Sequence, residues 1–311
     1  MSHSAIDVST PAFIPGSVRA LATDDPAEIL GFAAACLREG GDVALATLVE
    51  IRGGAARALG SHVAVAADGR YCGYVSGGCV EAAVASEALL AVAEGRDRTV
   101  MFGDGSPFFD IVLPCGGGIS IAIHLLREGT AIEQVLDRLR NRQPAGLRYN
   151  PERQSLRLVD APERACWQAD DFLTIYRPRT RLVISGQTVE ASAVARLGAA
   201  SDFEVFVRAA GRSIVEDADA FTAIVFLHHD LDQEAPVLEA ALGSPAFYVG
   251  ALGSTRTQRR RVERLRERGF CSDDLSRIKA PIGIFGPTRD STSLALSILA
   301  DVAACRLATY G

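Results

Sequence analysis

The second half of the chain alternates between short apolar runs and amphipathic stretches, and this alternation constrains the fold more than any other feature. Apolar runs predict strands at residues 182–184, 203–207, 223–227, 246–249 and 282–285. Helical patterns lie between or after them, at residues 189–197, 234–242, 255–268 and 291–307. Strands that alternate with helices are typical of a parallel sheet with helices on both faces. We therefore expect an α/β fold whose C-terminal part, residues 181–311, is a Rossmann-like doubly wound parallel sheet domain.

The first half mixes predicted strands and helices without this regular alternation. A helix is expected up to residue 38, with Pro26 at its first position. We expect an N-terminal mixed α/β domain over residues 21–142, preceded by a flexible leader at residues 1–20. Residues 143–180 are more polar and predict a linker with short strands.

Two glycine-rich loops in the first half each carry a cysteine. Glycine lets a backbone come close to a ligand, and such loops present N–H groups to anions where a helix begins. A helix is expected just after Cys79, and a helix N-terminus favours the thiolate form of a cysteine. These loops predict a site for a small molecule that carries phosphate, sulfur or metal. Their candidate binding residues are Gly77, Gly78, Cys79, Glu81, Cys115, Gly116 and Gly117.

Each of these residues also has a simpler explanation. Cys79 and Cys115 are equally explained as inert thiols, since free cysteine is among the most buried residue types. Glu81 would complement the dipole of the helix that it begins. The remaining five of the seven cysteines are expected to be structural.

The loop at residues 250–256 joins a predicted strand to a helix crowded with arginine. Ser254 is a good N-cap, and Thr255 and Arg256 would hold a phosphate together with backbone N–H groups. The alternative is a solvated helix whose arginines pair with neighbouring glutamates. His228 follows a strand and is a candidate metal ligand or proton-transfer group, or simply a polar residue at a strand end.

The turn after residues 182–184 is similar to a dinucleotide-binding turn but lacks the pattern G-x-G-x-x-G. Gly186 matches the first glycine, whereas Thr188 and Ala191 stand at the second and third positions. The second glycine normally lets the pyrophosphate approach the backbone. Arg208 follows the strand that normally ends in an acidic ribose ligand. We therefore expect weak or no binding of NAD(P).

The composition excludes several classes of function. A formal net charge of −6 argues against general nucleic-acid binding. No apolar run is expected to span a bilayer, so no membrane role is predicted. An odd number of cysteines without an export signal fits free thiols in a reducing cytoplasm.

These motifs, in this order, resemble the xanthine dehydrogenase accessory protein family of the XdhC/CoxI type. The resemblance covers most of the chain, and its most specific segments are residues 76–81, 115–117, 247–257, 281–283 and 295–300. It implies an XdhC domain followed by a Rossmann domain. It also implies that the chain binds the molybdenum cofactor, supports its sulfuration and delivers it to a xanthine dehydrogenase-like molybdenum hydroxylase.

The resemblance further implies roles for particular residues. Cys79 and Cys115 are expected to lie near molybdenum as thiolates, in a cleft between the domains. Arg256 and the backbone N–H groups of both glycine loops are expected to receive the pterin phosphate. The expected partners are the client hydroxylase, a cysteine desulfurase and a second copy of the chain in a homodimer. His228-His229-Asp230 stands where the family usually has His-Asp-His, which puts nucleotide binding in doubt more than cofactor handling.

Two functions of other classes stay open beside this one. An NAD(P)-dependent oxidoreductase rests on the alternating sheet alone. A nucleotidyltransferase acting on molybdopterin would need paired carboxylates that hold Mg²⁺ beside a phosphate loop, and the sequence offers no convincing pair. The sequence therefore favours a cofactor-binding accessory protein over a turnover enzyme.

Overall fold

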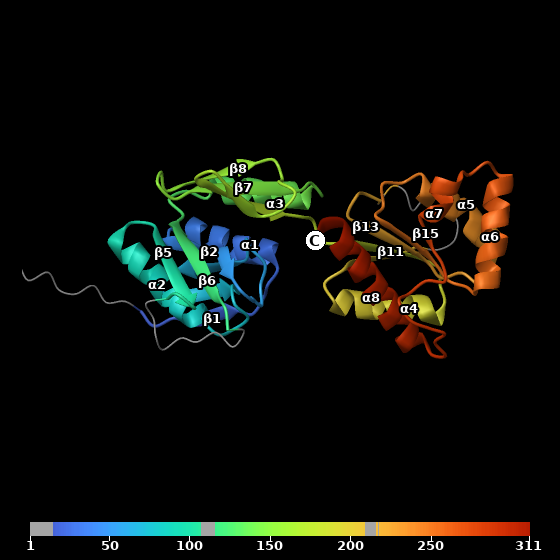
Figure 1. The fold of residues 1–311 in the computed structure, drawn as a ribbon, viewed down its shortest axis with the longest axis horizontal. Helices are drawn as coiled ribbons and strands as arrows, with labels where there is room; N and C mark the ends of the chain where they lie inside the picture. Colours follow the sequence, from blue (N-terminus) through green and yellow to red (C-terminus); the bar gives the residue numbers. More distant parts are fainter. Residues whose placement is uncertain (1–14, 107–115, 209–215, 217) are drawn as a thin grey trace, which may run out of the picture. The chain divides into compact units, whose positions relative to one another are not determined.

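The computed structural model describes residues 15–106, 116–208, 216 and 218–311. The chain divides into two compact units, with unit 1 ending at Arg177 and unit 2 beginning at Pro178 (Figure 1). Each unit combines helices with at least one sheet, so the α/β fold class is confirmed.

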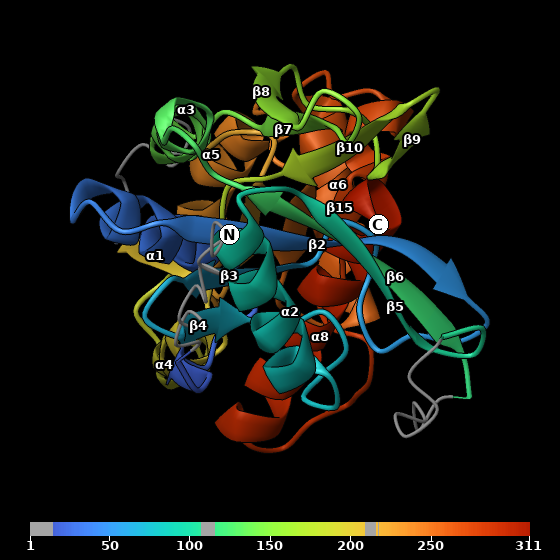
Figure 2. The ribbon, with the colours of Figure 1, turned by 90° about the vertical axis from the view of Figure 1, so that its left-hand side faces the viewer.

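Unit 1 contains a mixed sheet whose described strands run in the order β1-β4-β3-β2-β6-β5. The parallel pair is β1 with β4, and the other neighbours are antiparallel. Helix α2 (Glu81–Glu94) packs on one face, while α1 (Pro26–Arg38) and α3 (Thr130–Arg140) pack on the other (Figure 2). The strands are β1 (Val18–Leu21), β2 (Val43–Arg52), β3 (His62–Ala66), β4 (Arg70–Gly73), β5 (Arg98–Gly103) and β6 (Gly118–Leu125).

The short strands predicted within residues 143–180 are present, but instead of a linker they form a second sheet, over residues 145–176, that belongs to unit 1. Its described strands run antiparallel in the order β8-β7-β10-β9. Leu147 and Tyr176 from this sheet are buried in the same cluster as residues of α1 and α3. The Trp167 indole N–H also donates to the carbonyl of Val49 at 3.0 Å. The strands are β7 (Ala145–Asn150), β8 (Ser155–Val159), β9 (Cys166–Gln168) and β10 (Asp171–Tyr176).

Unit 2 contains a sheet whose described strands are all parallel, in the order β12-β11-β13-β14-β15. Helices α4 and α8 pack on one face, and α5, α6 and α7 pack on the other. This confirms the predicted doubly wound sheet, and its strand order reverses between β11 and β13. The strands are β11 (Arg181–Ser185), β12 (Glu204–Arg208), β13 (Thr222–Phe226), β14 (Tyr248–Ala251) and β15 (Ile278–Lys279). The helices are α4 (Val189–Ala200), α5 (Leu231–Leu242), α6 (Thr255–Glu267), α7 (Ser272–Ser276) and α8 (Ser291–Tyr310).

One predicted strand of unit 2 does not match the described structure. Residues 282–285 form a loop, and the strand nearest to them is β15. Gly283 has a φ angle of 100°, which interrupts an extended backbone. In the first half of the chain, the sequence also predicts a strand at residues 108–113, which lies outside the described residues.

The expectation that no segment could span a membrane is wrong as far as length and composition go. Helix α8 is long enough and apolar enough to do so by these two criteria. Its apolar character has another explanation within unit 2. Ala295, Ile298 and Val302 are fully buried in the cluster that α8 shares with α4 and the sheet. One face of α8 therefore packs into the core of this unit, while Leu296 and Leu307 elsewhere on the helix are exposed.

Candidate functional site

The Cys79 loop connects strand β4 to helix α2. Gly77 and Gly78 have φ angles of 106° and 117°, which residues with side chains rarely adopt. Helix α2 begins at Glu81, as the sequence predicted. Gly77, Gly78 and Cys79 are exposed, so the thiol stands at the surface.

Glu81 turns its carboxylate back into this loop instead of toward solvent. It is 0% exposed, and Oε1 accepts hydrogen bonds from the backbone N–H groups of Val75, Ser76 and Gly77 at 3.0, 2.8 and 3.1 Å. Burial by itself would raise the pKa of Glu81, but hydrogen bonds, first those from the backbone of Ser76 and Val75, hold the pKa below its usual value. Because no part of the side chain is exposed, the structure does not support direct contact between Glu81 and a cofactor.

The Ser76 hydroxyl connects this carboxylate to the backbone of Cys79. Its Oγ lies 3.0 Å from both carboxylate oxygens of Glu81. The same oxygen accepts hydrogen bonds from the N–H groups of Cys79 and Val80 at 3.2 and 3.3 Å. Much of the donor capacity that the loop was expected to offer to a phosphate is thus used inside the protein.

Cys115 lies outside the described residues, so only the end of its loop is described. Gly116 is exposed, whereas Gly117 is buried. A methyl group on Gly117 would come within 2.5 Å of the carbonyl oxygens of Arg52 and Gly54. Gly117 is therefore explained by close packing of one backbone on another, without a ligand.

A short segment after β2 contacts the described parts of both glycine loops. A methyl group on Gly53 would lie 3.5 Å from the Cα atom of Gly117. One on Gly77 would lie 3.5 Å from the Cβ atom of Ala56. The two loops therefore approach the same segment, although a shared thiol site stays a prediction while Cys115 is not described.

The start of helix α6 places the three predicted phosphate residues around two different hollows. Ser254 caps the helix, and its Oγ accepts from the N–H of Thr257 at 3.2 Å. Ser254 and Thr255 line a hollow of about 680 Å³ together with residues 281–288. Arg256 lines another hollow, of about 550 Å³. The sequence did not predict this separation.

The hollow beside Arg256 combines cations with two carboxylates. Arg256 and Arg260 lie one helical turn apart and are both exposed. Arg264, one turn further along, forms an ion pair with Asp232 at 2.7 Å. Arg256 and Arg260 are therefore the cations in this hollow best able to receive an anion from solution.

His228 forms a local contact at the point where the strand order reverses. Its Nε2 lies 2.8 Å from Oγ of Ser185, and burial lowers the pKa of the ring. Within the described part of the chain, no group of three or more His, Cys, Asp and Glu side chains is arranged to hold a metal ion. The predicted metal role of His228 therefore has no supporting ligands.

The start of helix α4 already carries a negative charge. Thr188 caps the helix by accepting from the N–H of Ala191 at 3.2 Å. Glu190 lies in the first turn, and its own backbone N–H is the main cause of its lowered pKa. A carboxylate at this position opposes a pyrophosphate. The structure thus adds Glu190 to Thr188 as a reason to expect weak binding of NAD(P).

One arginine of α6 is not solvated, contrary to the simple alternative for this helix. The side chains of Arg261 and Glu234 are 3% and 1% exposed and form a two-pronged ion pair. Arg261 also donates to the carbonyl of Leu252 at 2.8 Å, just after β14. The spacing in the sequence could have indicated this burial. Arg261 lies four residues before the buried Leu265, so both side chains lie on the same face of the helix.

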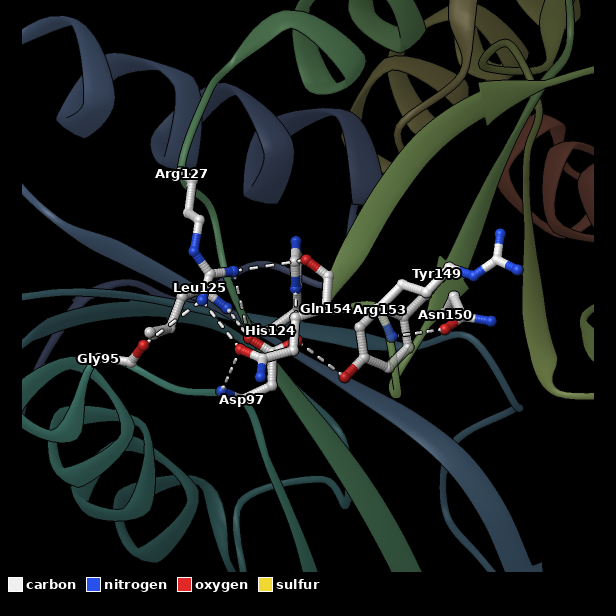
Figure 3. A network of polar contacts seen from close by, with 9 residues as sticks. All are labelled: Gly95, Asp97, His124, Leu125, Arg127, Tyr149, Asn150, Arg153 and Gln154. Atoms are coloured by element: carbon white, nitrogen blue, oxygen red, sulfur yellow. Dashed lines mark hydrogen bonds and ion pairs between the residues drawn. The ribbon is translucent and has the colours of Figure 1, made fainter.

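A buried polar network joins the two sheets of unit 1 (Figure 3). Asp97 Oδ2 lies 2.7 Å from Nδ1 of His124 on β6 and accepts from the Tyr149 hydroxyl on β7 at 3.0 Å. Burial raises the pKa of Asp97, but its contacts, first those with His124, bring the pKa below its usual value. No local motif marks these residues, because they meet only through the packing of the sheets.

Known proteins provide an independent comparison. Residues 36–103 match the XdhC and CoxI family, and residues 182–302 match the XdhC Rossmann domain. A crystal structure described as a xanthine dehydrogenase from Bacillus halodurans matches with a TM-score of 0.69 at 17% identity. The match covers 90% of this chain and 96% of that one, and it shows a shared fold.

Two curated proteins of Escherichia coli K12 are also similar. An uncharacterized protein, YqeB, is 22% identical over 281 residues, and the match spans 42% of its length. The molybdenum cofactor insertion chaperone PaoD is 49% identical over 294 residues, which is 93% of this chain and 91% of PaoD. This chain therefore belongs to the XdhC/CoxI family.

Proposed function

We propose that this chain binds the molybdenum cofactor as cargo and inserts it into a molybdenum hydroxylase. The observation that carries the proposal is the 49% identity, over 93% of the chain, to a protein named a molybdenum cofactor insertion chaperone. The exposed thiol of Cys79 supports it, because thiolates suit the soft chemistry of a metal held by dithiolene sulfur. The activity proposed is binding and release instead of catalytic turnover.

The two ends of the cargo differ in chemistry, and so do the candidate residues. Cys79, with Cys115 as the proposed second thiolate, would approach the metal and its sulfur. The pterin phosphate would bind at the start of α6, where Arg256 and Arg260 are exposed beside a hollow of about 550 Å³.

The proposed partners follow from this role. A cofactor chaperone needs a client hydroxylase that receives the cofactor, and a cysteine desulfurase would supply the sulfur that activates it. We also propose a cytoplasmic location and a homodimer. Nucleic acid is not a proposed partner, because the formal net charge is −6.

The test begins with the protein purified from a host that makes the cofactor. Elemental analysis measures molybdenum, and fluorescence after oxidation measures the pterin. A second assay measures whether the loaded protein activates a cofactor-free hydroxylase. We expect all three signals in the wild type. Absence of pterin together with failure to activate the hydroxylase would contradict the proposal.

Cysteine variants test the proposed role of the thiol. Cys79→Ser should lower the retained molybdenum or its activating sulfur. Cys271→Ser is the matched control, because Cys271 is also exposed but lies at the start of α7 in unit 2. Equal losses in both variants would remove Cys79 from the proposed site.

A further inference from the structure

The Glu81 carboxylate fills the place that an external anion would take in the Cys79 loop. Consecutive N–H groups of a tight loop before a helix form a concave site, or nest, for phosphate and carboxylate groups. Here the N–H groups of Val75, Ser76 and Gly77 converge on one oxygen of Glu81 within 3.1 Å. The nest is formed, but a side chain of the protein occupies it.

The helix end beneath this nest relies on the same carboxylate. Val80, the N-cap residue of α2, makes no side-chain capping hydrogen bond, and Glu81 is the acidic residue of the first turn. Its charge therefore offsets the positive end of the helix. Without that charge, a buried pocket with several unpaired N–H groups would remain, and such a pocket attracts anions.

We propose that Glu81 determines the specificity of the Cys79 loop, because its carboxylate closes the loop to phosphate groups and positions it to present the thiol. The contact reaches Cys79 through one hydroxyl, since Ser76 Oγ lies 3.0 Å from the carboxylate and accepts from the Cys79 N–H at 3.2 Å. The inference rests on the proposed function in one respect. If the loop is closed to phosphate, the phosphate of the cofactor must bind elsewhere, as proposed for the start of α6.

The rate at which iodoacetamide alkylates Cys79, followed by mass spectrometry on the full chain, tests this proposal. In the wild type, inorganic phosphate should not change the rate. Glu81→Ala vacates the nest and removes a negative charge, so Cys79 should react faster by about two- to fivefold, the usual range for one charge at a helix N-terminus. Phosphate should then enter the nest and slow the reaction again.

Two controls separate this effect from general loosening of the protein. Cys271, also exposed, should react at one rate in every variant. Glu87→Ala removes a carboxylate from the same helix, but Glu87 pairs with Arg98 at 3.1 Å, outside the loop. In Glu87→Ala, Cys79 should be alkylated at the wild-type rate, and phosphate should not change that rate. A loss of stability alone gives no phosphate response.

Phosphate sensitivity in Glu81→Ala supports the proposal, whereas a folded Glu81→Ala protein with wild-type rates with and without phosphate overturns it. Should Glu81→Ala not fold, Glu81→Gln keeps the shape and one acceptor oxygen without the charge. It should show a smaller rise of the same sign, and an unchanged rate in that variant would overturn the proposal as well. Since the assay uses no cofactor, a wild type that carries no pterin would refute the proposed function and leave this inference standing.

Discussion

Arg261→Met should destabilise unit 2 far more than the loss of an exposed arginine from helix α6. It keeps a flexible apolar chain but removes the guanidinium, so the Glu234 carboxylate stays buried, at 1% exposed, without a partner. Breaking a buried ion pair from one side costs about 3–5 kcal/mol of unfolding free energy. Arg264→Met is the matched control, because Arg264 and Asp232 are 46% and 81% exposed. An exposed pair contributes about 0–1 kcal/mol.

Urea unfolding with two probes localises the effect. Trp167, the single tryptophan, lies in β9, so its fluorescence follows unit 1, while far-UV circular dichroism follows the helices of both units. Arg261→Met should leave the fluorescence midpoint unchanged and move part of the dichroism transition to lower urea. With a slope of about 1–3 kcal/mol per molar urea, a loss of about 4 kcal/mol shifts a midpoint by roughly 1–4 M.

A double variant identifies the cause of the loss. Replacing a buried ion pair by apolar groups is often neutral or stabilising, because both charges are removed together. Arg261→Met with Glu234→Leu should therefore recover most of the stability. The reasoning is refuted if the double variant is as unstable as Arg261→Met, or if Arg261→Met unfolds at the same urea concentration as Arg264→Met.

Three further outcomes are expected. Burial lowers the pKa of His62 from 6.5 to about 4, so its contribution to stability is complete above pH 6.5 and is lost as the pH falls toward 4. In titrations of unfolding free energy, His62→Gln should remove roughly 3 kcal/mol of this pH dependence, whereas the exposed His229→Gln should not. Asp97 has a lowered pKa, so its contribution is present above about pH 4 and lost below it; Asp97→Asn should lower stability at pH 7 and flatten the acid limb. Arg256→Ala should weaken binding of metal-free molybdopterin in calorimetry by roughly 1.5–3 kcal/mol, whereas Arg259→Ala, outside the hollow, should leave it unchanged.

The fold of unit 2 was predictable because its signals are local. The apolar strands are buried on both faces and read as continuous runs, and a clear helical pattern follows each of β11, β13 and β14. The loop at residues 282–285 misled the prediction, since its apolar side chains resemble a strand. Ile284 and Phe285 are 56% and 53% exposed there, and Gly283 turns the backbone.

The sequence predicted short strands at residues 143–180, but it did not show that they form a second sheet of unit 1. Strand β9 is three residues long, and β8 is half-buried except for the exposed Arg157, so neither shows a clean alternation. Their stability comes from partners distant in sequence, such as the contact between Trp167 and Val49, 118 residues apart. The Asp97 network has the same origin, because Tyr149 lies 52 residues from Asp97.

The sequence marked the Cys79 loop as a candidate site, but it did not show which way the Glu81 carboxylate points. A carboxylate in the first turn of a helix is stabilised by the dipole whether it faces a ligand or the protein. Val75 to Gly77 precede Glu81 by four to six residues, and the positive φ angles of Gly77 and Gly78 let the chain turn back over the carboxylate. Sequence spacing alone does not reveal this return.

The three helix starts that the sequence marked as candidates differ in the charge that their first turn carries. Helix α2 carries Glu81 in its first turn, and α4 carries Glu190. Helix α6 has no acidic residue in its first turn, and Arg256 stands there instead. An anion from solution competes with a tethered carboxylate at the first two sites and is attracted by a cation at the third. Of these three helix starts, α6 is therefore the one where the phosphate of a cofactor is expected to bind.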